Sequence, residues 1–196
     1  MRNPLLIVLG VLAASLTVSG CSGSGSGAEA GGSPDAAAAV PQGVASMYRT
    51  VEEEIDEAGG ATTTGEWRVG YVVEAAEPWF EHGGGHHDFR APAPGETHHI
   101  EIIPIEKSTG RIMPTVPIHV EVLAEDGTVV DKKDLNFYYA EFFHYANNFE
   151  VPDSGTYRIR ATLSAPTFKR HGEAEEGPAL AKGATVTFDD VELGAQ

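Results

Sequence analysis

The chain has 196 residues and a formal net charge of −16 at pH 7, because 29 Asp and Glu outnumber 13 Lys and Arg. This balance argues against nucleic-acid binding and against electrostatic adhesion to anionic lipid, since both require clustered Lys and Arg. The acidity either keeps the protein soluble or creates a negative field that concentrates cations. A single cysteine leaves no disulfide within the chain, so the fold must depend on an apolar core.

Residues 1–20 have the features of a signal peptide. Arg2 precedes an apolar run from Leu5 to Leu16, which is too short to span a bilayer comfortably. Small residues then lead to Cys21, and the segment resembles a prokaryotic lipoprotein signal with its lipobox. The resemblance implies that Cys21 becomes the first residue and carries lipid. We therefore predict a lipid-anchored protein on the extracytoplasmic face of the cell membrane, in the periplasm or at the cell surface. An ordinary secretory peptide with a coincidental cysteine is the alternative.

The next two segments differ in composition. Residues 21–46 are rich in Gly, Ser, Ala and Pro, which is typical of a flexible tether. Residues 47–60 predict a short amphipathic helix, because apolar side chains recur at helical spacing up to Ile55 and acidic residues occupy the other face. Gly59 and Gly60 would end the helix. We expect the helix to pack on the edge of the domain, and binding of a partner is the alternative.

Residues 66–193 predict a single β domain. Apolar and polar residues alternate in short runs separated by turn signals, among them Asp126-Gly127. Tyr157 follows a glycine turn at the start of a core strand, as in the tyrosine corner of immunoglobulin-like domains. The sequence therefore predicts an immunoglobulin-like antiparallel β-sandwich. The predicted strands are 67–73, 98–105, 118–123, 128–131, 135–139, 145–151, 156–164 and 185–193.

The sequence carries no familiar catalytic signature. It lacks Gly-x-Ser-x-Gly, His-Glu-x-x-His and a phosphate-binding loop, and the predicted lipid uses its one thiol. We therefore expect a protein that is not an enzyme, with a copper-dependent redox protein as the competing hypothesis. Metal binding is the chemistry to consider, because all eight histidines lie between His82 and His171.

Three segments carry candidate metal ligands. His99 and Glu101 lie two residues apart on a predicted strand and so share a face, where an imidazole and a carboxylate could bind a divalent ion. A solvated strand face is the simpler interpretation of this pair. His144 lies between aromatics and a polar turn, as a core histidine or a ligand would. His171 lies in a loop. Because imidazole must be neutral to ligate, affinity is expected to fall below about pH 6.

His82, His86 and His87 form a second cluster around three glycines. The glycines predict a flexible loop, so ordering it around a metal would cost backbone entropy. These histidines are candidate accessory ligands that could capture metal weakly or form a lid. A mobile polar loop without metal is the alternative.

The order of these segments resembles the periplasmic metal-binding proteins of the ferrous-iron transport family. That family has a His-x-Glu strand, a His-Tyr-Gly-x-Asn segment, a Gly-x-Tyr turn and a later loop histidine. The matching stretches here are His99-Ile100-Glu101, His144-Tyr145-Ala146-Asn147-Asn148, Gly155-Thr156-Tyr157 and Lys169-Arg170-His171. The resemblance implies an immunoglobulin-like sandwich, usually a homodimer, that binds copper and iron beside an iron permease. The ligands it implies are His99, Glu101, His144 and His171.

The chain departs from the family pattern at two positions. The family methionine would fall near Phe137, yet no methionine lies between Met113 and His144. Glu141 is a candidate hard replacement and an accessory ligand. Without a thioether, cupric copper, zinc or iron is favoured over cuprous copper. The family glycine is replaced by Ala146, so the chain is identified as a divergent member.

The sequence thus predicts a membrane-anchored extracytoplasmic lipoprotein that binds a transition metal, copper or iron with zinc as an alternative. It would assist iron or copper uptake by a membrane transporter. The first alternative is a structural or adhesive surface lipoprotein with the same sandwich and no metal. The second is a copper scavenger.

Overall fold

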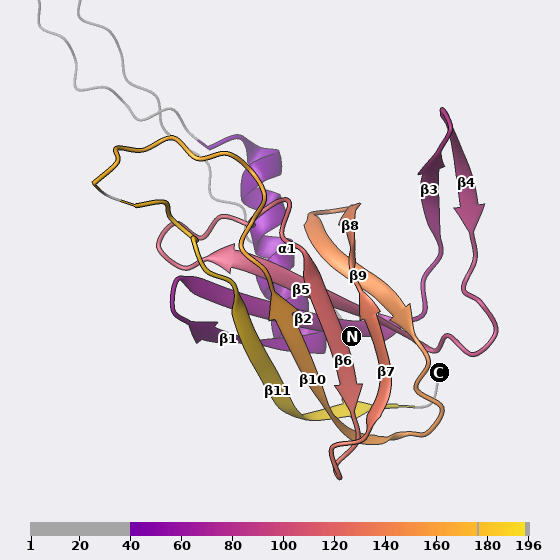
Figure 1. Cartoon of the computed structure of the whole chain (residues 1–196). Coiled ribbons are helices and arrows are strands. Elements are labelled where there is room, and N and C mark those ends of the chain that lie inside the picture. Colours follow the sequence, from indigo (N-terminus) through magenta and orange to yellow (C-terminus); the bar gives the residue numbers. More distant parts are fainter. Residues whose placement is uncertain (1–39, 176, 195–196) are drawn as a thin grey trace, which may run out of the picture. The chain divides into compact units, whose positions relative to one another are not determined.

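The computed structural model describes residues 40–175 and 177–194 (Figure 1). The predicted signal peptide, Cys21 and most of the predicted tether lie outside the described residues. Within the described part, no helix is both long enough and apolar enough to cross a bilayer.

Two antiparallel sheets and one small hairpin make up the β structure. The first sheet contains, in order, β1 (Gly59–Thr64), β2 (Trp67–Ala75), β5 (His98–Glu106), β9 (Phe143–Phe149) and β8 (Asn136–Tyr139). The second sheet contains β11 (Ala184–Leu193), β10 (Gly155–Leu163), β6 (Ile118–Leu123) and β7 (Val129–Asp134). The hairpin pairs β3 (Trp79–Gly83) with β4 (His86–Arg90). All eight predicted strands are present, with ends that differ by a few residues.

The core lies between the two sheets and follows the period of two that the sequence shows. On β5, Ile100 and Ile102 are fully buried in this core, whereas Ile103 belongs to a second apolar cluster on the other face of the sheet. Tyr157 donates a hydrogen bond from its hydroxyl to the carbonyl oxygen of Asp153 at 2.7 Å, which is the tyrosine corner. The immunoglobulin-like β-sandwich is therefore confirmed.

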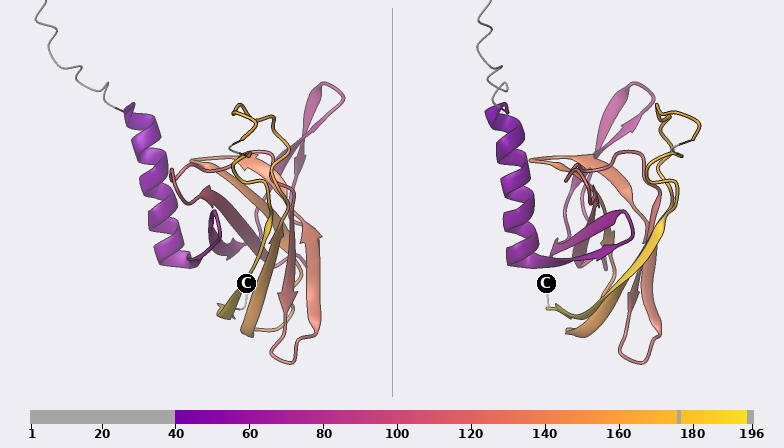
Figure 2. Two further views of the ribbon diagram at one scale, coloured as in Figure 1. Left: turned by 60° about the vertical axis from the view of Figure 1, so that its left-hand side comes forward. Right: turned by 90° about the vertical axis from the view of Figure 1, so that its left-hand side faces the viewer.

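The helix α1 (Gln42–Ala58) covers the outer face of the first sheet (Figure 2). Its buried residues Val51 and Ile55 pack in the second cluster with Ile103 of β5. The helix begins at Gln42 rather than at residue 47 and ends before Gly59. A Cβ at Gly59 would lie 1.7 Å from the carbonyl oxygen of Tyr71, so only glycine fits where the chain turns from α1 into β1.

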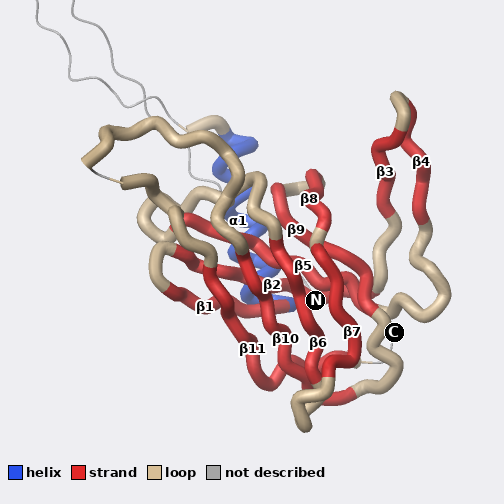
Figure 3. Tube along the Cα trace, viewed as in Figure 1, coloured by secondary structure: helices blue, strands red, loops and turns tan. Residues whose placement is uncertain are grey.

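The segment 82–87 is not the flexible loop that its glycines suggested. It forms the tip of the β3–β4 hairpin, which extends away from both sheets (Figure 3). Gly84 and Gly85 have φ angles of 55° and 87° and make the two-residue connection. A Gly-Gly pair suits a type I′ turn, which requires positive φ at both positions and matches the twist of the flanking strands. The glycines therefore fix a tight hairpin.

Candidate metal centre

Two histidines and one glutamate from two neighbouring strands converge on the outer face of the first sheet. His99 and Glu101 come from β5, and His144 comes from β9. The Nε2 atoms of His99 and His144 lie 3.9 Å and 3.5 Å from the Glu101 Oε1 atom. Over the part of the chain that the structure describes, these three residues form the one group of three or more metal-ligating side chains. Their ligand atoms all lie within 4.8 Å of one another.

The strand register explains the convergence. β5 and β9 are antiparallel, with Glu101 opposite Ala146. His144 is two residues from Ala146, so it is the diagonal neighbour of Glu101 on the same face of the sheet, where long side chains can meet. All three residues are buried, with exposed fractions of 2% for His99, 4% for Glu101 and 6% for His144. The centre is therefore an interior site, not a solvated strand face.

Asn148 holds the imidazole of His99 in position. The two residues are opposite each other on β9 and β5. The Asn148 side-chain oxygen lies 2.8 Å from His99 Nδ1 and also accepts a hydrogen bond from the Glu77 backbone N–H at 3.1 Å. An accepting oxygen at Nδ1 requires the proton there, so the Nε2 lone pair is free to ligate.

Burial makes the centre electrically neutral near pH 7. It raises the pKa of Glu101 to about 8, and nearby carboxylates add to the effect, Glu74 foremost. Burial also lowers the pKa of His144 to about 4, with a further contribution from facing His99, whose own pKa burial lowers too. Without metal, the Glu101 carboxyl is protonated at neutral pH and both imidazoles are neutral. The short contacts among these groups are therefore not ion pairs.

The centre leaves polar atoms without partners. The Glu101 Oε2 and His144 Nδ1 atoms are buried and accept or donate no hydrogen bond. Each such buried group costs about 1–3 kcal/mol. Atoms separated by 3.5 Å, 3.9 Å and at most 4.8 Å share a point roughly 2.4 Å from each, close to the bond lengths of about 2.0–2.2 Å between zinc and nitrogen or oxygen. A small movement would let one ion bind all three.

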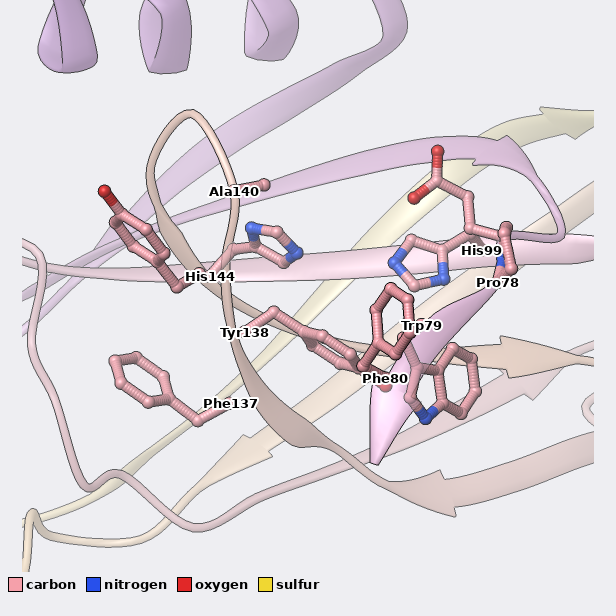
Figure 4. Close-up of a pocket in the computed structure, with 10 residues that line it drawn as sticks. Pro78, Trp79, Phe80, His99, Phe137, Tyr138, Ala140 and His144 are labelled. Atoms are coloured by element: carbon pink, nitrogen blue, oxygen red, sulfur yellow. The ribbon is translucent and has the colours of Figure 1, made fainter. Parts of the chain in front are cut away.

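The centre opens into a cavity of about 350 Å³ (Figure 4). The rings of His99 and His144 face this space, with Tyr138 and Trp79 along one side. The Tyr138 ring stacks on His144 with centroids 5.6 Å apart, and the Trp79 ring lies 6.5 Å from His99. No methionine lines the cavity. An ion held by three ligands would keep open coordination positions toward this space.

His171 does not join the group. It lies exposed in the loop between β10 and β11, next to Arg170, which donates a hydrogen bond to the Leu180 carbonyl at 3.1 Å. The Leu180 N–H donates to the carboxylate of Glu66, just before β2 begins. Glu101 pairs with Val72 of β2, which lies six residues beyond Glu66, or about 20 Å along the strand. The loop that carries His171 is therefore tied to the chain far from Glu101.

The remaining candidate ligands lie outside the group. Glu141 is exposed, and its charge contributes to the raised pKa of Glu101. His82, His86 and His87 lie on the exposed hairpin. These four residues supply no ligand to the three-residue group.

Several contributors to the centre were not assigned a role from the sequence. Phe137, where the family methionine was expected, lines the cavity beside Tyr138. Asn148 was visible only as part of the His-Tyr motif, and nothing in its own position indicated that it orients His99. Trp79 carried no signal in the sequence, because it reaches the cavity from a hairpin formed by residues for which the sequence predicted no strands.

The sandwich and its buried histidine and carboxylate donors define a β-sandwich protein with a candidate transition-metal centre on one sheet face. Residues 97–193 match the sequence model of the family described as Fe2+ transport protein. The resemblance inferred from the His-x-Glu and His-Tyr segments is thereby confirmed. A comparison with curated proteins finds no significant match.

Solved structures share the fold. FetP from uropathogenic Escherichia coli superposes with a TM-score of 0.56 at 21% identity, over 70% of this chain and 96% of its own. A copper-bound variant of P19 from Campylobacter jejuni gives 0.56 at 19% identity, over 71% of this chain and 98% of its own. A copper-bound FetP variant gives 0.56 at 17% identity, with 71% and 92% covered.

Proposed function

We propose that this chain is a membrane-anchored extracytoplasmic lipoprotein that binds a transition metal ion through His99, Glu101 and His144. It would assist iron or copper uptake by passing metal to a membrane permease. The lipid at Cys21 would hold it to the membrane, and residues 21–46 would serve as the tether. The proposal assigns binding and transfer to the domain, not catalysis.

One observation carries the proposal: three ligating side chains meet in the interior, and two of them, Glu101 and His144, each keep a buried polar atom without a hydrogen-bond partner. Buried polar groups in proteins are normally hydrogen-bonded, so two orphaned atoms mark a cluster whose polar groups the protein alone does not fully satisfy, as is expected of a ligand site. The family match and the copper-bound relatives of the same fold agree with this interpretation. Open positions toward the cavity would allow the ion to exchange, as a transfer protein requires.

The donor set favours a borderline metal. Two neutral imidazoles and one carboxylate suit cupric copper, zinc or ferrous iron, and the cavity supplies no thioether for cuprous copper. Metal binding would displace the proton of Glu101, which then supplies the negative charge that the buried ion requires.

The test is metal binding by the full-length protein with single substitutions. His144→Ala and His99→Ala should each weaken binding by at least about 100-fold, more than the loss typical of a group that only supports a ligand. His119→Ala is the control, because His119 is an exposed histidine on β6 paired with Asp134. Elemental analysis after loading with competing copper, zinc and iron gives the measurement. Wild-type affinity in both cavity variants would reject the site.

The alternative is a structural or adhesive sandwich without metal. It predicts a melting temperature that does not respond to copper, zinc or iron. Under our proposal, a metal at 100 times its dissociation constant adds about 2.7 kcal/mol to the free energy of unfolding. Thermal unfolding with and without each ion therefore separates the two hypotheses.

A further inference from the structure

The β3–β4 hairpin carries a pair of histidines apart from the buried centre. His82 and His87 are directly opposite each other in the strand register. Their ring centroids lie 5.0 Å apart at an interplanar angle of 47°. Phe80 and Phe89 form the next cross-strand pair on the same face, with centroids 5.4 Å apart. All four side chains are exposed.

His86 does not belong to this pair. Neighbouring residues of a strand point to opposite faces, so His86 lies on the face away from His87. Its Nε2 atom lies 3.0 Å from the Asp88 carboxylate. The histidine cluster read from the sequence is therefore divided into one cross-strand pair and one separate histidine.

The separation of the pair suits a shared metal ion. An ion about 2.0 Å from a ring nitrogen lies about 3.2 Å from the ring centre. Two imidazoles that each point a nitrogen at one ion, with ring centres 5.0 Å apart, would subtend an angle of about 100° at that ion, near the tetrahedral angle. The hairpin thus offers two imidazoles at a separation that one zinc or copper ion can bridge.

The hairpin holds the pair before any metal binds. The Gly84-Gly85 turn fixes the register of its strands. At its base, the Arg90 guanidinium lies 4.0 Å from the centre of the Trp79 ring and forms an ion pair with Glu96 at 2.6 Å. A preformed pair loses less conformational entropy on binding than a flexible loop would.

We propose that His82 and His87 form a second, exposed site for a divalent transition metal ion, whose remaining positions are filled by water. The ring of Trp79 at the hairpin base lines the cavity beside His99. The exposed site therefore belongs to the same β3–β4 hairpin whose base borders the opening of the buried centre. It depends on its own two residues and not on the proposed function.

Titration of the metal-free full-length protein with Zn²⁺ and with Cu²⁺, by calorimetry and by competition with a chromophoric chelator, tests the site. We expect two ions per chain, one tight and one weaker. The double variant His82→Gln with His87→Gln should lose the weaker ion, with at least a tenfold fall in that affinity. His86→Gln, on the same hairpin but on its other face, should keep both ions.

Retention of the second ion in the double variant overturns the proposal, as does an equal loss in His86→Gln. All three side chains are exposed, and circular dichroism verifies that the variants fold. His144→Ala separates this test from that of the buried centre, because it should remove the tight ion and leave the weaker one on the hairpin.

Discussion

At the scale of single residues, the candidate centre depends on burial as much as on ligand type. Glu101 would be an ordinary carboxylate on an exposed strand. Beneath α1 and beside other carboxylates, it keeps its proton to about pH 8. Burial likewise lowers the pKa of His144 to about 4, and it also lowers the pKa of His99. These pKa values alter the expectation that metal affinity falls below about pH 6. His144 competes for a proton only near pH 4, so at higher pH the protonation of Glu101 determines how metal affinity depends on pH.

Substitution of Glu101 should therefore change how the metal-free protein responds to pH. The folded state holds a proton that the unfolded state releases above pH 4.5, so Glu101 favours folding at low pH and this advantage is lost as pH rises through 8. His144 acts in the opposite direction, but only below pH 6.5. Between pH 6.5 and 8 the wild type should lose about 2 kcal/mol of unfolding free energy. Glu101→Gln should lose little, as urea unfolding would measure; equal slopes would contradict the raised pKa.

Metal binding should release a proton from Glu101 and none from the imidazoles. At pH 7, about one proton per ion should appear in solution, because only the carboxyl is protonated beforehand. Calorimetry in buffers with different ionisation enthalpies counts this proton. Glu101→Gln should abolish it, and release of two or more protons per ion would show that the imidazoles are charged before binding.

At the scale of elements, a strand register, a helix and a hairpin together position the centre. The β5–β9 register brings Glu101 beside His144, α1 covers the same face, and the hairpin base adds Trp79. The junction between α1 and β1 depends on Gly59, which admits the Tyr71 carbonyl where any side chain would collide.

Substitution by alanine should have different effects on the free energy of unfolding at two glycines, one at this junction and one in the first turn of α1. Gly59→Ala should lower the free energy of unfolding by about 1–3 kcal/mol, because the new Cβ meets backbone that cannot rotate away. Gly43→Ala, in the first turn of α1, has open space and should be neutral or stabilising by up to about 1 kcal/mol. Chemical denaturation measures both. If Gly59→Ala left the free energy of unfolding unchanged, the chain at Gly59 would not approach the Tyr71 carbonyl as closely as the structure shows.

At the scale of the whole molecule, the proposed task requires the domain to stay at the membrane. The anchor follows from the sequence around Cys21 alone, since these residues lie outside the described structure. Cells producing the protein with Cys21→Ser should contain it in the soluble extracytoplasmic fraction, without incorporated radioactive palmitate. A variant that remains in the membrane fraction would disprove lipidation at this position. The substitution should leave metal binding unchanged.

The sequence by itself determined the β-sandwich, because alternation at period two and turn residues are local signals that each strand carries in its own residues. It also placed His99 and Glu101 on one face, since that requires only strand geometry. The meeting of Glu101 with His144, the orientation of His99 by Asn148 and the separation of His171 were decided by tertiary structure. Each depends on how strands distant in the chain pair and which loops lie over them. The hairpin combines both kinds of information. Its Gly-Gly pair is a local sequence feature, but the pairing of His82 with His87 depends on the register of the two strands.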